Sequence, residues 1–200
     1  MRIPTQERAR KRVAQILGAA AHLVAHDGVD AVTTTSLAKT AKVPVGSVYQ
    51  YFDDADDILR TVQNEQASEI VAACHAALAK APDGLGWRET TRLSFDTYWA
   101  ELLKRPVYVA LLRAATRSQS FAESVSTGDS DLGDLFRAGL IRGGATLPAD
   151  RTHVIVETAL GSLSTLTDLA MLADDTDERD ARRDEMLRMI ELYLSDALGE

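Results

Sequence analysis

The sequence predicts an all-α fold with about nine helices. Apolar residues recur at three- and four-residue intervals along most of the 200-residue chain, which is the spacing of one buried helix face. The alternation of apolar and polar residues that indicates a half-buried strand does not occur in it. Hydrophobic residues make up 46% of the chain and charged residues 26%, as in an ordinary globular protein.

Four helices are predicted in the first 80 residues. Gly28 suits the position just after the first of them, because glycine readily adopts the left-handed conformation found there. Thr33 can cap the start of a short helix, and Asp54 with Asp57 three residues later can cap a long one. The predicted segments are residues 8–27, residues 33–43, two turns that end at Phe52 after a break at 44–47, and residues 54–80.

A turn at Pro82-Asp83-Gly84 is the predicted domain boundary. It separates a small three-helix domain within residues 8–65 from a larger helical domain over residues 82–200. In the larger domain, the polar segment 119–131 is predicted to be a flexible link or a frayed helix end. The predicted helices there are residues 87–104, 106–116, 132–141, 149–172 and 178–198.

The charge is unevenly distributed along the chain. Residues 1–52 carry seven basic and three acidic residues, a formal charge of +4, whereas residues 53–200 carry −12. Such asymmetry favours an N-terminal surface that faces an anion such as nucleic acid. An ordinary basic tail would give the same distribution.

The sequence also indicates the compartment. Its single cysteine, Cys74, excludes an internal disulfide and favours a reducing compartment. The N-terminus lacks the apolar core of a signal peptide, and no uninterrupted apolar run approaches the roughly 18 residues of a membrane span. We therefore predict a cytoplasmic protein without a membrane partner.

Residues 33–52 have the layout of a helix-turn-helix, in which the second helix enters the DNA major groove. Gly46 and Ser47 are small enough for close approach to DNA, and Gln50 can donate to and accept from an adenine edge. Tyr49 and Tyr51 offer hydroxyls to phosphates and rings to thymine methyl groups. Alternatively, the rings could fill a three-helix core. We expect only Val48 and Phe52 to do so, since three large aromatic residues within four positions are too many for one buried face.

Residues at fixed spacings extend this pattern beyond the turn itself. They are Gly28, Thr33, Leu37, Ala38, Ala41, Val43 and the run Gly46-Ser47-Val48-Tyr49-Gln50-Tyr51-Phe52. The set resembles the N-terminal DNA-binding domain of TetR-family transcriptional regulators, and the resemblance covers residues 8–65 with every spacing in register.

The resemblance implies a DNA-binding regulator, usually a repressor, that binds a palindromic operator in double-stranded DNA as a homodimer. It also implies a C-terminal domain whose small-molecule pocket controls DNA affinity. With the groove residues above, the expected DNA contacts are Arg8, Arg10, Lys11, Arg12, Thr34, Thr35, Val45, Gly46, Ser47, Tyr49, Gln50 and Tyr51.

Three positions depart from the family pattern. Ala55 stands where the family commonly has a lysine that holds a phosphate, and four aspartates surround it. Lys42 stands at the usual glycine of the turn, which predicts left-handed backbone strain. Pro44 replaces a common serine cap, and its ring presets φ for the recognition helix.

The effector pocket is predicted from aromatic residues. Residues 87–141 contain seven of the eleven aromatic residues in the chain, and packed rings with a few polar groups are typical of a pocket for a largely apolar molecule. The same rings could instead fill a helical core. The candidate ligand contacts are Phe95, Tyr98, Trp99, Tyr108, Leu112, Arg113, Thr116 and Phe136.

The last two predicted helices carry the expected dimer interface. Small residues at 161, 162 and 164 would let a partner helix approach closely, and two such helices packed on their twofold mates would form a four-helix bundle. The apolar stripe could equally belong to the core of one chain. The candidate contacts are Leu160, Leu163, Leu166, Ile190, Tyr193 and Leu194.

Two other functions are considered. One is a regulator that responds to a protein partner rather than a small ligand. The other is a Mg²⁺-dependent enzyme, because Asp53-Asp54-x-x-Asp57 and Asp174-Asp175-x-x-Glu178 resemble the two aspartate-rich motifs of all-α prenyl-diphosphate enzymes. The chain is short for that fold, and both motifs begin predicted helices, where acidic residues act as caps.

Other catalytic or metal-binding signals are weak. His22 and His26 have the i,i+4 spacing of metal ligands, but no third ligand accompanies them. The prediction is therefore a protein without catalytic residues, cofactor or metal.

Overall fold

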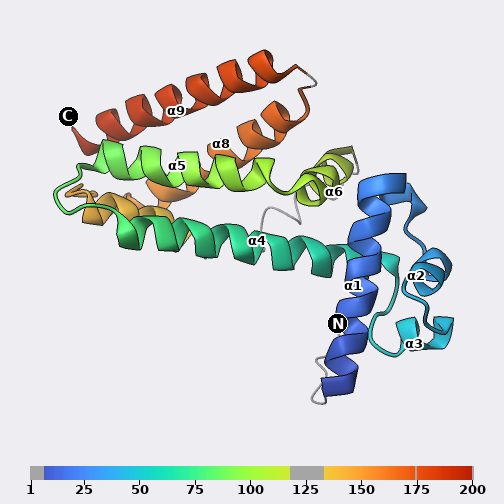
Figure 1. The fold of residues 1–200 in the computed structure, drawn as a ribbon. Helices are drawn as coiled ribbons and strands as arrows, with labels where there is room; N and C mark the ends of the chain where they lie inside the picture. The colour runs from blue at the N-terminus through green and yellow to red at the C-terminus, as the bar shows by residue number, and fades with distance from the viewer. Residues whose placement is uncertain (1–6, 118–132, 174, 200) are drawn as a thin grey trace. The chain divides into compact units, whose positions relative to one another are not determined.

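The computed structural model describes residues 7–117, 133–173 and 175–199 (Figure 1). All regular secondary structure within these ranges is helical, which confirms the predicted all-α fold. The predicted link at 119–131 and Asp174 of the second aspartate-rich motif lie outside the described residues.

The helices follow the predicted ones closely, apart from two local differences. A short 3-10 turn, η1, follows the first helix, and the third helix both begins and ends earlier than the pattern indicated. The helix predicted at 132–141 covers residues 133–142 in the structure. The remaining bounds are α1 Glu7–Asp27, η1 Val29–Ala31, α2 Thr34–Thr40, α3 Val45–Tyr49, α4 Ala55–Lys80, α5 Trp87–Leu103, α6 Pro106–Arg117, α8 Thr152–Met171 and α9 Thr176–Leu198.

Side-chain caps explain where two of these helices begin. The Thr33 hydroxyl accepts from the Ser36 N–H at 3.1 Å, and the Ser36 hydroxyl oxygen accepts from the Thr33 N–H at 2.9 Å. At the start of α4, a carboxylate oxygen of Asp54 accepts from the Asp57 N–H at 2.7 Å. Both caps satisfy backbone N–H groups that have no partner within the helix.

The chain forms two compact units. Unit 1 contains the described residues up to Ser68 together with Arg105–Ala114. Its core is built mainly from α1, with buried residues of α2, α3 and the first turns of α4, and Leu111 of α6 belongs to it. Residues 105–114 therefore pack with the N-terminal helices, although the sequence boundary at Pro82 assigned them to the C-terminal domain.

Unit 2 contains Glu69–Lys104 and the described residues from 115 onward. In Figure 1, α9 lies alongside α5 within this unit, and α8 packs against α9. Its main core includes Trp87, Ile155, Ala159, Ile190 and Leu194. At the rim, Arg92 pairs with Glu191 at 2.6 Å, which joins α5 to α9.

Helix α8 is unusually apolar. Among the described residues it is the one helix long and apolar enough to cross a membrane by composition, with a mean hydropathy of 1.2. Ile155 and Ala159 are nevertheless fully buried in the core of unit 2. Core helices commonly have this composition.

Candidate nucleic-acid interface and ligand pocket

The helix-turn-helix is held by a small buried core in unit 1. Leu37 of α2, Val48 of α3 and Phe52 are at most 1% exposed, which confirms that Val48 and Phe52 are core residues. The amide nitrogen of the Gln15 side chain donates to the Ala41 carbonyl at 2.6 Å and ties α1 to the turn. The orientation of α3 is therefore fixed both by its buried core contacts and by the turn that precedes it.

The turn itself contains the predicted strain. Lys42 has φ 54°, and it is the one non-glycine residue with positive φ in the described part of the chain. This conformation disfavours a residue with a Cβ atom. It allows the Val43 N–H to reach back to the Ala38 carbonyl at 2.9 Å, so the turn stays tight without glycine.

The outer face of α3 is open to solvent. Tyr49 is 54% exposed and Val45 39%, and Gly46 and Gln50 are exposed as well. The Tyr49 hydroxyl lies 3.1 Å from that of Thr34 at the start of α2. One hydrogen bond therefore joins two of the expected DNA contacts and fixes the aromatic side chain before any ligand binds.

The other expected contacts on α2 and α3 differ in exposure. Thr35 is exposed, whereas Thr34 and Ser47 are half-buried. Tyr51 is also half-buried, because its ring packs against the core of unit 1. The structure thus leaves Tyr51 with less free surface than Tyr49.

Basic residues line the first turns of α1. Arg8, Arg10 and Lys11 are exposed, and Arg12 is half-buried. Lys11 pairs with Glu7 at 2.9 Å, and Arg12 donates to the Gln15 side-chain oxygen at 3.3 Å. Exposed pairs of this kind are weak, so they compete little with a phosphate for these cations.

The aspartates that follow α3 have a structural role. Burial acts to raise the pKa of Asp57, whereas the hydrogen bond from the Asp53 N–H and the charge of Arg60 act to lower it, and the pKa lies below its ordinary value. Asp54 and Asp57 are thus occupied at the start of α4. Ala55 packs against the core of unit 1, where a lysine head group would have to reach outward.

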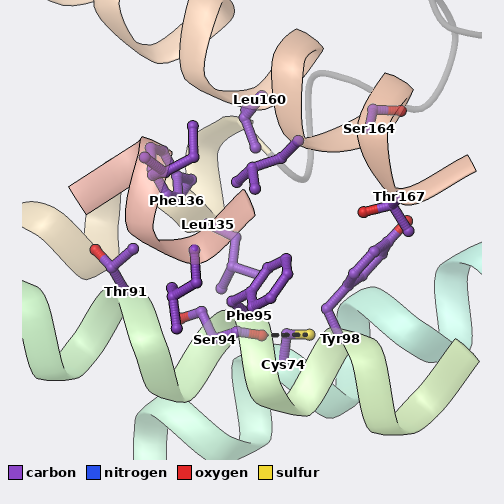
Figure 2. A pocket seen from close by; sticks show the side chains of 13 residues that line it. Cys74, Thr91, Ser94, Phe95, Tyr98, Leu135, Phe136, Leu160, Ser164 and Thr167 are labelled. Carbon is purple, nitrogen blue, oxygen red and sulfur yellow. Dashed lines mark hydrogen bonds between the residues drawn. The ribbon is translucent and has the colours of Figure 1, made fainter. Parts of the chain in front are cut away.

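A pocket lies within unit 2 (Figure 2). Three of the predicted ligand contacts, Phe95, Tyr98 and Phe136, line it. Sequence reasoning missed several others because their types are common in any core. These are Cys74, Thr91, Ser94, Leu135, Ser164, Thr167 and Leu187.

The remaining predicted ligand contacts lie elsewhere. Trp99 is buried, with its ring centroid 6.0 Å from that of Phe95, but it does not line the pocket. Tyr108, Leu112 and Arg113 belong to the part of α6 that packs in unit 1. Thr116 lies in α6, and its side chain is outside the described residues.

The expected dimer contacts divide into two groups. Leu160, Ile190 and Leu194 are buried inside unit 2. They therefore already pack in the core of the single chain. Leu163, Leu166 and Tyr193 are half-buried, and Leu163 lines the pocket as well. Large apolar side chains outside the expected contact set are exposed on α8 and α9, namely Val154, Leu169, Met189 and Leu192.

Comparison with known proteins adds independent information. Residues 16–62 match the family of bacterial regulatory proteins described as the tetR family. The whole chain is similar in structure to a TetR-family transcriptional regulator from Streptomyces coelicolor, with a TM-score of 0.63 and 26% identity over 94% of this chain and 99% of that one. No protein of curated function matches the sequence.

Two other solved structures share the fold and contain ligands. RolR in complex with resorcinol has a TM-score of 0.63 at 20% identity, over 96% of this chain and 95% of that one. FadR from Bacillus subtilis in complex with stearoyl-CoA has a TM-score of 0.68 at 16% identity, over 88% and 96% respectively.

Proposed function

The chain belongs to the TetR family of bacterial regulatory proteins, and we propose that it is a cytoplasmic repressor that a small effector releases from DNA. As a family member it is a DNA-binding transcriptional regulator and not an enzyme. The observation that carries the proposal is the exposed face of α3, on which Tyr49 is held by the Thr34 hydroxyl. A recognition helix with a fixed orientation reads base edges without a large ordering cost on binding.

The DNA contacts divide by their chemistry. Gln50 is exposed and can form two hydrogen bonds with an adenine edge. Of the bonded Thr34 and Tyr49 hydroxyls, the one that accepts the bond between them keeps its proton to donate to a phosphate, and such a contact fixes the position of the helix in the groove. The cations of α1 attract the backbone of any DNA sequence. The full proposed set is Arg8, Arg10, Lys11, Arg12, Thr34, Thr35, Val45, Gly46, Ser47, Tyr49, Gln50 and Tyr51.

Gln50→Ala should relax specificity at one base pair of each half-site. The lost pair of hydrogen bonds is worth about 1–3 kcal/mol per half-site against the correct base. The operator would first be selected from a random DNA pool, and the variant then titrated against operators changed at each position. Failure of the native protein to enrich any sequence would contradict the proposed operator binding.

Arg10→Ala is the matched control for Gln50→Ala. It removes an exposed cation of α1 and should lower the affinity for all DNA sequences alike. It should also lower the salt dependence of binding. If Gln50→Ala lowered the affinity for every DNA sequence equally, Gln50 would not recognise a specific base.

The homodimer is supported by the apolar surface of α8 and α9. Only 41% of the apolar window of α8 is buried within the chain. On the surface, Leu169 is 45% exposed and Leu192 of α9 is 64% exposed. Large apolar side chains left exposed on two neighbouring helices are what a protein interface would cover. Packing against the same helices of a second copy would bury both, with Leu163, Leu166 and Tyr193 at the edge of the contact.

Leu192→Arg should disrupt this dimer. The native 21.7 kDa chain should sediment at twice that mass at micromolar concentration, whereas the variant would bury an unpaired charge and sediment as a monomer with weak operator binding. Leu103→Arg is the control, because Leu103 of α5 is also exposed but lies outside the proposed interface. A native protein that sediments as a monomer would contradict the proposal.

The effector is proposed to occupy the pocket of unit 2. Two proteins of the same fold were solved with resorcinol and with stearoyl-CoA, which supports a small-molecule effector here. The mostly apolar lining of the pocket favours a largely apolar one. Helix α4 starts at the helix-turn-helix and contributes Cys74 to the pocket lining. A shift of α4 on ligand binding would reorient the recognition helices. By linkage, the same ligand must bind less tightly to the DNA-bound dimer.

A further inference from the structure

We propose that the pocket of unit 2 selects an uncharged molecule, no larger than a single ring, with a hydrogen-bonding group that meets the Thr167 hydroxyl. The inference rests on the proposed effector function and specifies the chemistry of its ligand. Three properties of the lining support it, namely an unpartnered hydroxyl, the lack of charge and the small volume.

The first property is the unpartnered hydroxyl of Thr167. The residue lies on α8 with 0% exposure, and its side-chain oxygen has no hydrogen-bond partner. Figure 2 shows this oxygen pointing towards the centre of the lining. A buried hydroxyl without a partner is costly, so a ligand that supplies one gains affinity at this position.

Other helical hydroxyls near the pocket have found partners. Thr90 bonds to the carbonyls of Gly86, Trp87 and Gly139, and Ser94 donates to the Thr90 carbonyl at 2.9 Å. The hydroxyls of serine and threonine in helices commonly donate in this way to a backbone carbonyl of the preceding turn. Thr167 does not, which leaves its hydrogen-bonding capacity for a molecule in the pocket.

Among the described lining residues, Thr91 also has a buried hydroxyl without a hydrogen-bond partner. In Figure 2 it lies at the opposite side of the pocket from Thr167, and its oxygen is turned away from the centre. The two threonines are thus matched in chemistry and burial but differ in orientation. Thr91 therefore provides a control for Thr167.

The second property is the absence of charge. Among the described residues that line the pocket there is no Lys, Arg, His, Asp or Glu. Burial raises the pKa of the Cys74 thiol to about 11, with the nearby charge of Glu101 as a second cause, so this group stays neutral at pH 7. A buried ligand charge would find no counter-charge here, and an unpaired buried charge is strongly unfavourable.

The third property is size. The cavity has a volume of about 60 Å³. One buried water needs about 10–15 Å³, and a cavity of about 150 Å³ in another protein binds benzene. This cavity is smaller than that one, so a single ring already requires side chains such as Phe95 and Leu135 to move apart, and a larger rigid molecule would require more movement.

The test uses three probes of one ring each on the full-length protein. Benzyl alcohol is uncharged and can hydrogen-bond, toluene is uncharged and cannot, and benzoate is an anion. Calorimetric titration at millimolar probe should show benzyl alcohol binding roughly three- to tenfold more tightly than toluene, the range that one added hydrogen bond gives. Benzoate should show no binding.

Thr167→Val keeps the shape of the side chain and removes its hydroxyl. This variant should bind benzyl alcohol and toluene equally, with toluene affinity unchanged, while Thr91→Val should keep the native preference. The inference is overturned if benzoate binds as tightly as benzyl alcohol, if Thr167→Val keeps the preference, or if none of the probes binds. None of these results depends on selecting an operator from the DNA pool, and that experiment tests the proposed function separately.

Discussion

Phe52→Ala should unfold unit 1 in part or in full and abolish operator binding with it. Phe52 is 1% exposed and packs in the same core as Val48, which is 0% exposed. Removing a buried ring leaves a cavity and costs about 3–5 kcal/mol, a large part of the 5–15 kcal/mol that stabilises a typical domain. Urea unfolding followed by circular dichroism should show a much lower midpoint, and DNA affinity should fall in parallel.

Tyr49→Ala is the control, because it removes a ring three residues earlier in the same segment. Tyr49 is 54% exposed, and its loss also breaks the hydrogen bond to Thr34. We expect weaker operator binding with a nearly unchanged unfolding midpoint. Native-like stability of Phe52→Ala would show that the helix-turn-helix does not depend on this core.

The N-terminal helices could be predicted well because their signals are local. The Thr33 cap and the Asp54 cap lie within three residues of the groups that they satisfy, so short spacings in the sequence are sufficient. The positive φ of Lys42 was predicted from the family resemblance, because Lys42 stands at the usual glycine of the turn. The crowding of three large aromatic residues within four positions then indicated that Val48 and Phe52 are buried and that Tyr49 is exposed.

The pocket was predicted less completely because it depends on contacts between distant segments. Phe95 and Trp99 are one helical turn apart and both are buried, but only Phe95 lines the pocket. Which of them does so depends on how α5 packs against α8 and α9, and helical periodicity carries no information on that. A hydroxyl at a core position of an apolar helix, as at Thr167, was the one sequence signal available.

The dimer helices show the same limit. An apolar stripe has the same spacing whether its partner is in the same chain or in another copy. Ile190 and Leu194 are buried within unit 2, whereas Leu192, between them in sequence, is 64% exposed. The pattern could identify the two helices but not the face that remains free.

Gly143→Ala should strongly destabilise unit 2, because at this position the chain approaches the start of α5 very closely. A Cβ atom on Gly143 would lie 2.4 Å from the Trp87 Cα and 2.5 Å from its backbone nitrogen. Backbone atoms cannot yield as a side chain can, so the end of helix 133–142 must move away from α5. Overpacking of this kind typically costs about 1–3 kcal/mol, and occasionally more.

Gly139→Ala tests the same helix four residues earlier. Its added Cβ would meet the Leu78 side chain at 3.6 Å, which is an ordinary contact, and alanine within a helix is favoured over glycine by roughly 0.5–1 kcal/mol. Thermal unfolding should therefore show opposite shifts, down for Gly143→Ala and up for Gly139→Ala. Equal shifts would contradict the close approach at Trp87.

The Gly143→Ala substitution should also weaken ligand binding in the pocket of unit 2. Helix 133–142 supplies Leu135 and Phe136 to the lining, so a tilt of this helix, as its end moves away from Trp87, would shift two lining side chains. Calorimetry of Gly143→Ala at a temperature where it remains folded should therefore show weaker binding of benzyl alcohol than the native protein. Gly139→Ala, which leaves the helix in place, should bind it as the native protein does. Loss of stability without any change in probe affinity would mean that the pocket does not depend on the docking of this helix end.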